Sequence, residues 1–284
     1  MYRTAKADGP SIFYREAGPK DAPAILLLHG FPSSSRMYEP LFTRLCDRYH
    51  LIAPDYPGFG HSDWPDPKKF AYTFDHVASV MDDFTQSIGL SLYTLYMQDY
   101  GGPVGFRMAL SHPERVQAII IQNAVAHVEG LAPSRNFLQP FWDSRAGVES
   151  SFRTNFFALE TTRGGHIGKD PNPELYDPDL WTDEKAFLDK PGQADIQSDM
   201  MYDYRTNVDA YPKWQTWMRE RRPPLLVTWG RFDPVFDTGE AERYRQEAPK
   251  AEIHLLDAGH FALDTKAEEI GVLVGDFMKK TSGV

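Results

Sequence analysis

The sequence predicts an α/β protein with a mostly parallel central sheet, helices on both faces and an inserted helical cap. Short apolar runs, typical of strands that are buried on both faces, alternate with amphipathic segments of helical periodicity. This alternation stops over residues 124–223 and then resumes. We therefore expect residues 1–123 and 224–284 to form one core, and residues 124–223 to form a helical cap inserted in it.

The composition is that of an ordinary globular protein, and it argues against several kinds of partner. The chain has 284 residues and a formal net charge of −10, whereas nucleic acids and anionic membranes attract basic surfaces. A single cysteine, Cys46, excludes an internal disulfide and fits a reducing compartment. No secretory signal or membrane-spanning apolar run is visible. We expect a cytoplasmic monomer or homodimer that acts on a small apolar molecule and binds neither nucleic acid nor membrane.

In the first half of the chain, apolar runs predict strands at residues 11–17, 24–28, 50–53, 92–98 and 116–121. A helix to about residue 48 begins after three serines, whose hydroxyls can accept hydrogen bonds at a helix start. Residues 75–89 form the next helix, because their apolar positions share one face. Another helix is expected at 103–110. Ligands of parallel sheets bind at the carboxyl ends of the strands, so the loops after these strands should face one site.

In the second half, the α/β pattern returns after the cap, with strands predicted at 225–229 and 252–256 and helices at about 238–247 and 265–280. The intervening cap holds helical pieces, turns and many aromatic residues. We expect the cap to lie over the carboxyl edge of the sheet, with most of its aromatic side chains filling its own core.

Asp99 stands where the strand at 92–98 turns into the following helix. A sharp turn of this kind can hold one exposed side chain at its tip, and in the usual elbow that residue is a nucleophilic serine. A carboxylate at the tip is a candidate nucleophile that would form an ester with its substrate. The alternative interpretation is that Asp99 caps the start of the helix. This stretch alone favours neither interpretation.

Two further polar side chains stand at the ends of later strands, and the chain carries motifs around all three positions. Asp233 follows the strand at 225–229, and His260 follows the strand at 252–256, giving the order nucleophile, acid, histidine. The motifs are H-G-F-P at 29–32, D-Y-P-G-F-G-H-S at 55–62, Q-D-Y-G-G at 98–102, G-R-F-D-P at 230–234 and A-G-H-F at 258–261.

With aspartate at the elbow, these motifs resemble those of the epoxide hydrolase and haloalkane dehalogenase branch of the α/β-hydrolase fold. The resemblance covers essentially the whole chain and implies an α/β-hydrolase core with a helical lid. It implies that Asp99 attacks a saturated carbon and forms an alkyl-enzyme ester. His260 would then activate the water that hydrolyses this ester, and Asp233 would orient the imidazole.

The resemblance also implies an oxyanion hole formed by the backbone N–H groups of Phe31 and Tyr100, and a cis peptide bond between Phe31 and Pro32. Similar haloalkane dehalogenases hold the halide with an asparagine and a tryptophan at the positions of Phe31 and Tyr100, so the chain departs from them here. Epoxide hydrolases use cap tyrosines as acids, and Tyr204 lies in a similar Tyr-Arg-x-Asn segment. Their usual second tyrosine is not apparent.

We therefore expect an epoxide hydrolase that acts on small to medium apolar epoxides through Asp99, Asp233, His260 and Tyr204. The expected substrate pocket contains Phe31, Tyr100, Trp142, Phe156 and Phe261. A haloalkane dehalogenase-like hydrolase is the alternative; a non-catalytic ligand-binding relative or a serine esterase is less favoured, because the triad is complete and no G-x-S-x-G occurs. The histidines show no spacing typical of a metal site, and the glycines form neither a phosphate loop nor a dinucleotide-binding motif. We therefore expect no metal and no cofactor.

Overall fold

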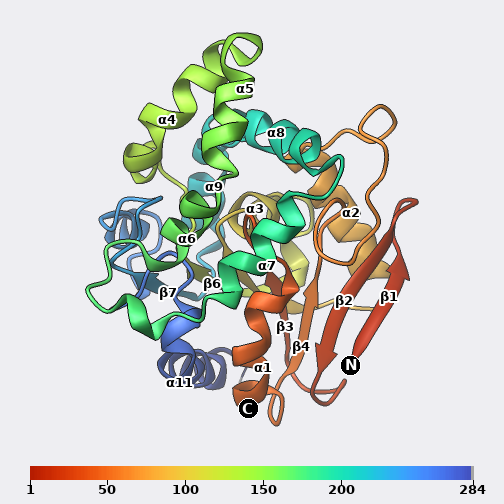
Figure 1. Cartoon of the computed structure of the whole chain (residues 1–284). Helices are drawn as coiled ribbons and strands as arrows, with labels where there is room; N and C mark the ends of the chain where they lie inside the picture. Colours follow the sequence, from red (N-terminus) through yellow and green to blue (C-terminus); the bar gives the residue numbers. More distant parts are fainter. Residues whose placement is uncertain (283–284) are drawn as a thin grey trace.

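The computed structural model describes residues 1–282 and contains a mixed sheet of eight strands (Figure 1). The strands are β1 (Tyr2–Lys6), β2 (Ser11–Ala17), β3 (Ala24–Leu28), β4 (His50–Pro54), β5 (Tyr93–Gln98), β6 (Val116–Gln122), β7 (Leu225–Gly230) and β8 (Glu252–Leu256). Their order is β1-β2-β4-β3-β5-β6-β7-β8, and only the pairings of β2 with β1 and β4 are antiparallel in the described sheet. The predicted mostly parallel sheet is confirmed.

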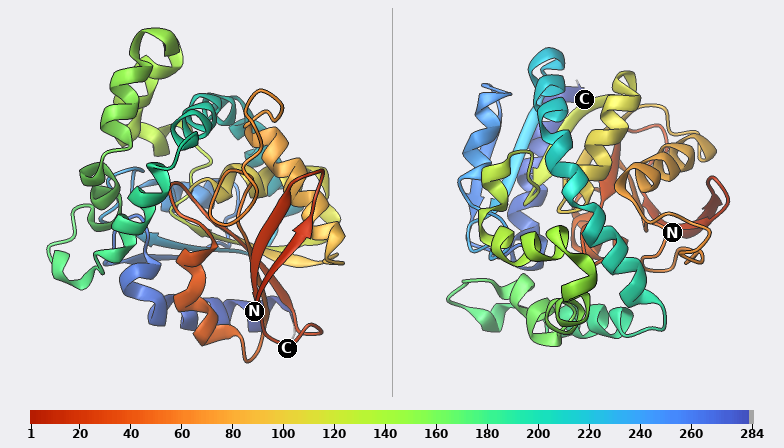
Figure 2. Two further views of the ribbon diagram at one scale, coloured as in Figure 1. Left: turned by 45° about the vertical axis from the view of Figure 1, so that its right-hand side comes forward. Right: turned by 90° about the horizontal axis from the view of Figure 1, so that it is seen from above.

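Helices cover both faces of the sheet, and a helical segment is inserted between β6 and β7. The core helices are α1 (Glu39–Leu45), α2 (Phe74–Ser87), α3 (Gly101–Ser111), α10 (Glu240–Arg243) and α11 (Leu263–Ser282). The inserted helices are α4 (Ala132–Asp143), α5 (Arg145–Phe156), α6 (Leu159–Ile167), α7 (Asp179–Leu188), α8 (Gln193–Asp203) and α9 (Arg205–Arg221). Figure 2 shows this helical segment along one edge of the sheet, with α4 and α5 in its outer part.

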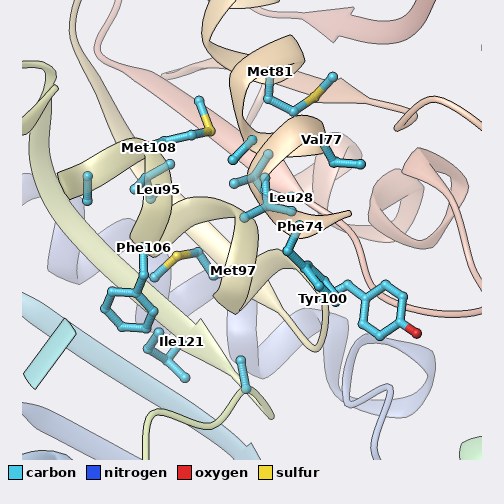
Figure 3. Close-up of a cluster of buried hydrophobic side chains, with 14 of the residues drawn as sticks. Leu28, Phe74, Val77, Met81, Leu95, Met97, Tyr100, Phe106, Met108 and Ile121 are labelled. Atoms are coloured by element: carbon cyan, nitrogen blue, oxygen red, sulfur yellow. The ribbon is translucent and has the colours of Figure 1, made fainter. Parts of the chain in front are cut away.

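The alternation of side chains along each strand builds two apolar cores. On β3, Leu26 and Leu28 point to the face covered by α2 and α3, while Ile25 and Leu27 point to the face covered by α1 and α11. All four side chains are fully buried, as expected for a parallel strand between two helical layers. Figure 3 shows part of the first core, which includes Leu28, Leu95, Met97, Val77, Met81, Phe106 and Met108.

Two elements differ from the sequence prediction. Strand β1 was not predicted, because its side chains are only exposed or half-buried and it forms the edge of the sheet, paired to β2 alone. The helix expected at 238–247 is shorter: α10 covers four residues and a 3₁₀ turn, Tyr244–Gln246, follows it. Within residues 1–282, no helix combines the length and the apolar character that crossing a membrane requires.

A buried histidine joins the inserted helices to the core. His166 on α6 bonds through Nδ1 to Asp264 Oδ2 on α11 and through Nε2 to Glu184 Oε2 on α7, both at 2.8 Å. Burial lowers the pKa of His166, but the two carboxylates outweigh burial and raise this pKa to about 10. At neutral pH the ring is therefore an imidazolium between two buried carboxylates, and it ties α6 and α7 to α11.

We predict that His166→Leu destabilises the protein by about 3–5 kcal/mol, because it leaves two buried carboxylates without a counter-charge. The folded pKa of about 10 lies above the unfolded value of 6.5. The stabilisation is therefore complete below pH 6.5 and is lost as pH rises towards 10. Urea unfolding of both proteins at several pH values measures this difference. As a control, His112→Leu removes a surface contact with Glu114 and should change the free energy of unfolding by less than about 1 kcal/mol; equal effects of the two substitutions would contradict the prediction.

Candidate active site

Asp99 occupies a left-handed turn between β5 and α3. Its φ is +48°, a conformation that is uncommon for residues other than glycine. Its backbone N–H donates to the carbonyl oxygen of Asn123 at 3.2 Å. A Cβ on Gly101 would lie 2.1 Å from the carbonyl oxygen of Leu28, so only glycine lets α3 start this close to β3. These contacts fix the turn that carries the carboxylate.

The carboxylate of Asp99 does not cap α3. The N-cap residue is Tyr100, and no side chain accepts a hydrogen bond there. Instead, Oδ1 of Asp99 accepts from the backbone N–H of Phe31 at 2.7 Å. Because Tyr100 begins the helix, its N–H has no partner within α3, and the helix N-terminus favours negative charge beside it. The Phe31 N–H, one of the two groups expected for an oxyanion hole, therefore binds the Asp99 carboxylate beside a cis Phe31–Pro32 bond, and the Tyr100 N–H directly follows Asp99 in the chain.

His260 lies between Asp99 and Asp233, although the three residues are far apart in the sequence. Its Nε2 is 3.7 Å from Asp99 Oδ2, and its Nδ1 is 2.9 Å from Asp233 Oδ2. Burial lowers the pKa of His260, but Asp233 and then Asp99 outweigh burial and raise this pKa to about 10. In the resting protein the ring is therefore protonated and lies between two carboxylates.

Asp233 is held by several donors, one of which the sequence analysis missed. Its Oδ1 accepts from the N–H groups of Val235 and Phe236 at 2.7 and 3.2 Å. Its Oδ2 accepts from Asn123 Nδ2 at 2.7 Å. Asn123 also accepts from the N–H of Gly230 at 2.9 Å. A polar residue directly after the apolar strand β6 was the available signal for Asn123.

A cavity of about 540 Å³ lies over Asp99 and His260. Most of its wall is apolar or aromatic and comes from both the core and the inserted helices, including Phe31, Tyr100, Phe137, Leu138, Phe156, Met201, Val235, Phe236 and Phe261. Four of the five expected pocket residues therefore line the cavity. Within the described residues, no cluster of three or more histidine, cysteine, aspartate or glutamate side chains has an arrangement suited to a metal.

The expectation that Trp142 lines the pocket is wrong. Its indole N–H donates to the carbonyl oxygen of Met201 at 3.0 Å, inside the cap. Its ring lies nearly parallel to that of Tyr204, with the centroids 6.2 Å apart and the planes at 7°. Trp142 therefore supports Tyr204 from outside the cavity, and no tryptophan in the described chain lines this cavity.

Tyr204 is part of the cavity wall and carries a polar atom without a regular partner. Its side chain is 3% exposed, and its hydroxyl forms no hydrogen bond of normal geometry with residues 1–282. Besides Trp142, Phe74 packs edge-on against its ring and Tyr100 lies 5.9 Å away, centroid to centroid. Burial, followed by the neighbouring Tyr211 and Asp99, raises the pKa of Tyr204 well above its usual value. The hydroxyl therefore remains protonated and available as a donor.

The arrangement combines a carboxylate, a charged imidazole and a phenolic donor in one mostly apolar cavity. A carboxylate held by one oxygen can attack with the other, and an imidazole paired with a second carboxylate can activate water once it loses its proton.

Comparisons with known proteins agree with this architecture. A family model described as alpha/beta hydrolase fold matches residues 23–267. The chain is 37% identical over 272 residues, 93% of each protein, to an uncharacterized hydrolase of Saccharomyces cerevisiae. It is 26% identical over 292 residues, 96% of this chain and 87% of the relative, to a cis-3-alkyl-4-alkyloxetan-2-one decarboxylase of Shewanella oneidensis. The structure of a haloalkane dehalogenase from Bradyrhizobium elkani superposes with a TM-score of 0.82 at 20% identity, covering 100% of this chain and 99% of the other. On the family model and the yeast relative, the chain belongs to the α/β-hydrolase fold family.

Proposed function

We propose that this protein is a hydrolase that uses Asp99 as a nucleophile to open small to medium apolar epoxides. The observation that carries the proposal is the Tyr204 hydroxyl, a buried donor without a regular hydrogen-bond partner in the same apolar cavity as Asp99. An epoxide oxygen leaves as an alkoxide and needs such a donor. A mostly apolar cavity also suits a carboxylate nucleophile, because its wall limits the contact of the charge with bulk water.

In the first step, Oδ2 of Asp99 attacks a ring carbon. Oδ1 is held by the Phe31 N–H, so Oδ2 is the oxygen that is free to react. The bond between this carbon and the ring oxygen breaks, and the oxygen takes the proton of Tyr204. The products are a neutral ester on Asp99, a new hydroxyl on the substrate and a tyrosinate at Tyr204.

In the second step, loss of the charge on Asp99 activates His260. Asp99 is one of the two carboxylates that raise the pKa of His260, so this pKa falls when the ester forms. His260 then releases a proton to solvent, and the tyrosinate at Tyr204 takes up a proton from solvent, so the net number of protons in the site is unchanged. Neutral His260 takes a proton from water, and the hydroxide attacks the carbonyl carbon of the ester. The resulting oxyanion would lie beside the N–H groups of Phe31 and Tyr100. When it collapses, the bond between the Asp99 carboxyl carbon and the substrate oxygen breaks, and the leaving oxygen takes the proton of the added hydroxyl. The diol is released, Asp99 is again a carboxylate, and His260 keeps the proton that it took from water.

Two other electrophiles are candidates. A haloalkane is the first, and the site disfavours it. The halide that leaves would find few hydrogen-bond donors, because Phe31 and Tyr100 lack side-chain N–H groups and the indole of Trp142 is bonded to Met201. The relative named as an oxetan-2-one decarboxylase favours a four-membered oxygen ring as a second candidate. Such a ring could be opened by the same carboxylate and hydroxyl.

The proposal is tested by a turnover screen with three substrate panels: aryl and alkyl epoxides, haloalkanes and a cis-3,4-dialkyloxetan-2-one. We predict diol formation from epoxides, and a loss of about 10²–10⁴-fold in the ring-opening rate of Tyr204→Phe because it removes the general acid. Any halide displacement should be spared. Tyr93→Phe is the control, since it also removes a buried hydroxyl without a regular partner but lies outside the cavity. Halide release without diol formation, or equal losses in both variants, would refute the proposal.

The ester intermediate should accumulate when the base is removed. We predict that His260→Gln is alkylated by a styrene-oxide-like epoxide and then stalls, so that mass spectrometry finds the substrate mass on Asp99. The D99N variant, which lacks the nucleophile, should carry no adduct. An unmodified H260Q protein that turns over at the wild-type rate would show that the roles of Asp99 and His260 are assigned wrongly.

The two steps should differ in their dependence on pH. The resting pKa of His260 is about 10, and ester formation lowers it. In single-turnover experiments we therefore predict that ester hydrolysis accelerates with rising pH through an apparent pKa below 10, because only neutral His260 can accept the proton of water. Stopped-flow measurement of both steps provides the test. A hydrolysis rate that is constant with pH would contradict a role for His260 as the base.

A further inference from the structure

Tyr204 lies at the junction of two cap helices, because α8 ends and α9 begins there. Its direction therefore depends on how these two helices are held on the core. On one side of the junction, Asp203 Oδ2 accepts from the backbone N–H of Phe74 on α2 at 2.8 Å. On the other side, Asn207 Oδ1 accepts from Nη1 of Arg107 on α3 at 2.7 Å. Two hydrogen bonds from the cap to the core thus flank Tyr204.

Arg107 holds the start of α9 with more than one group. Besides its bond to Asn207, its Nη2 donates to Thr206 Oγ1 at 3.3 Å. Its Nη1 also donates to the carbonyl oxygen of Pro103 at 3.2 Å, and its Nε donates to Asp75 Oδ1 on α2 at 2.6 Å. The Arg107 side chain is only 11% exposed, and Asn207 is fully buried. Because a guanidinium is planar and its donors form a fixed fork, these bonds hold α2, α3 and α9 in one relative placement.

The guanidinium of Arg107 also lies against a ring that contacts Tyr204. It is 5.6 Å from the centroid of Phe74. The ring of Phe74 packs edge-on against that of Tyr204, with centroids 5.6 Å apart. Phe74 packs in the same way against Tyr100, at 4.9 Å (Figure 3). Arg107 itself does not line the cavity over Asp99, so it reaches the site only through other residues.

Helix α3 connects Arg107 to the nucleophile. The helix begins at Gly101, two residues after Asp99, and carries Arg107 about two turns further along. The hydrogen bonds of a helix fix the distance between its residues, so the position of Arg107 relative to Asp99 is set by α3. The bonds of Arg107 to α9 then set the position of Tyr204. One helix and one side chain therefore join the nucleophile of the core to the hydroxyl of the cap.

From this arrangement we infer that Arg107 is a positioning residue that sets the distance between Asp99 and Tyr204. The inference rests on the proposed function. In ring opening, the carboxylate must reach a ring carbon while the hydroxyl reaches the ring oxygen of the same epoxide. A displacement of about 1 Å between two such groups can slow a reaction by about 10²-fold. Ester hydrolysis does not use the Tyr204 hydroxyl, so only the first step should depend on Arg107.

A double-mutant cycle in single turnovers with a styrene-oxide-like epoxide tests this role. Arg107→Met keeps an unbranched stem and removes the guanidinium. Ester formation should slow about 10–100-fold, and the rate of ester hydrolysis should be unchanged. The double variant R107M/Y204F should be no slower than Y204F alone, because Arg107 acts only through Tyr204.

Asn207→Leu breaks the same bond from its other end and should give the same pattern as Arg107→Met. It leaves the ion pair of Arg107 with Asp75 in place, so it provides the test if Arg107→Met does not fold. Urea unfolding of each variant shows whether the rates are measured on folded protein.

Arg36→Met is the matched control. Arg36 lies in the 3₁₀ turn Ser35–Tyr38 and pairs with Asp183 on α7, so this change also removes a guanidinium that joins core and cap. Arg36 does not line the cavity over Asp99, and both steps should keep the wild-type rate in this variant.

The inference is overturned if R107M and N207L form the ester as fast as the wild type. It is also overturned if R107M slows Y204F as much as it slows the wild type, or if it slows both steps equally, since either result indicates a general structural effect. An absence of epoxide turnover by the wild-type protein would refute the proposed function, and this inference with it. The two failures are distinguishable, because the first requires a wild-type protein that turns over epoxides.

Discussion

The left-handed turn at Asp99 is the constraint on which the site depends. In the middle of a regular strand or helix, this carboxylate would lie between the sheet and a helical layer or on the surface. At the turn it projects from the edge of the sheet into the cavity. The turn persists because its surroundings over-determine it: Asn123 accepts its N–H, Gly101 lets α3 approach Leu28, and the Phe31 N–H binds its side chain. Asn123 follows β6 and Phe31 follows β3, so these strands must be paired with β5 before the turn is stable.

Charge is the second organising feature. The resting site holds an imidazolium between two carboxylates, and the nearby seam between cap and core repeats this pattern with His166, Glu184 and Asp264. In the seam neither carboxylate faces the cavity over Asp99, and the histidine only joins helices. In the site one carboxylate would lose its charge on reacting, and the histidine would then change from a charged group to a base. The same arrangement can therefore be structural or catalytic, depending on whether one carboxylate can be esterified.

Sequence reasoning located the residues at strand ends and was weaker in the cap. Asp99, Asp233 and His260 each follow an apolar run, and parallel topology brings such ends together; their distances of 3.7 and 2.9 Å agree with that expectation. Trp142 was misplaced because aromatic residues lie on several faces of the cap helices, so the periodicity does not identify the face that meets the cavity. The position of Asn123 after an apolar strand marks it as a candidate, but its bond to Asp233 and the contact of His166 with Asp264 depend on the three-dimensional approach of distant segments.

The side chain of Asn123 has a consequence for how this molecule can diversify. The side-chain amide of Asn123 connects the ends of β6 and β7 to Asp233, and the backbone carbonyl oxygen of the same residue accepts from the N–H of Asp99. The spacing of these two carboxylates is thus set by the sheet alone. The cap contributes Tyr204 and most of the outer cavity wall, but none of this spacing. Substitutions that accumulate in the cap can therefore change which molecules enter the cavity without changing the distance between Asp99 and Asp233. The two acids and the cavity wall can evolve independently of each other.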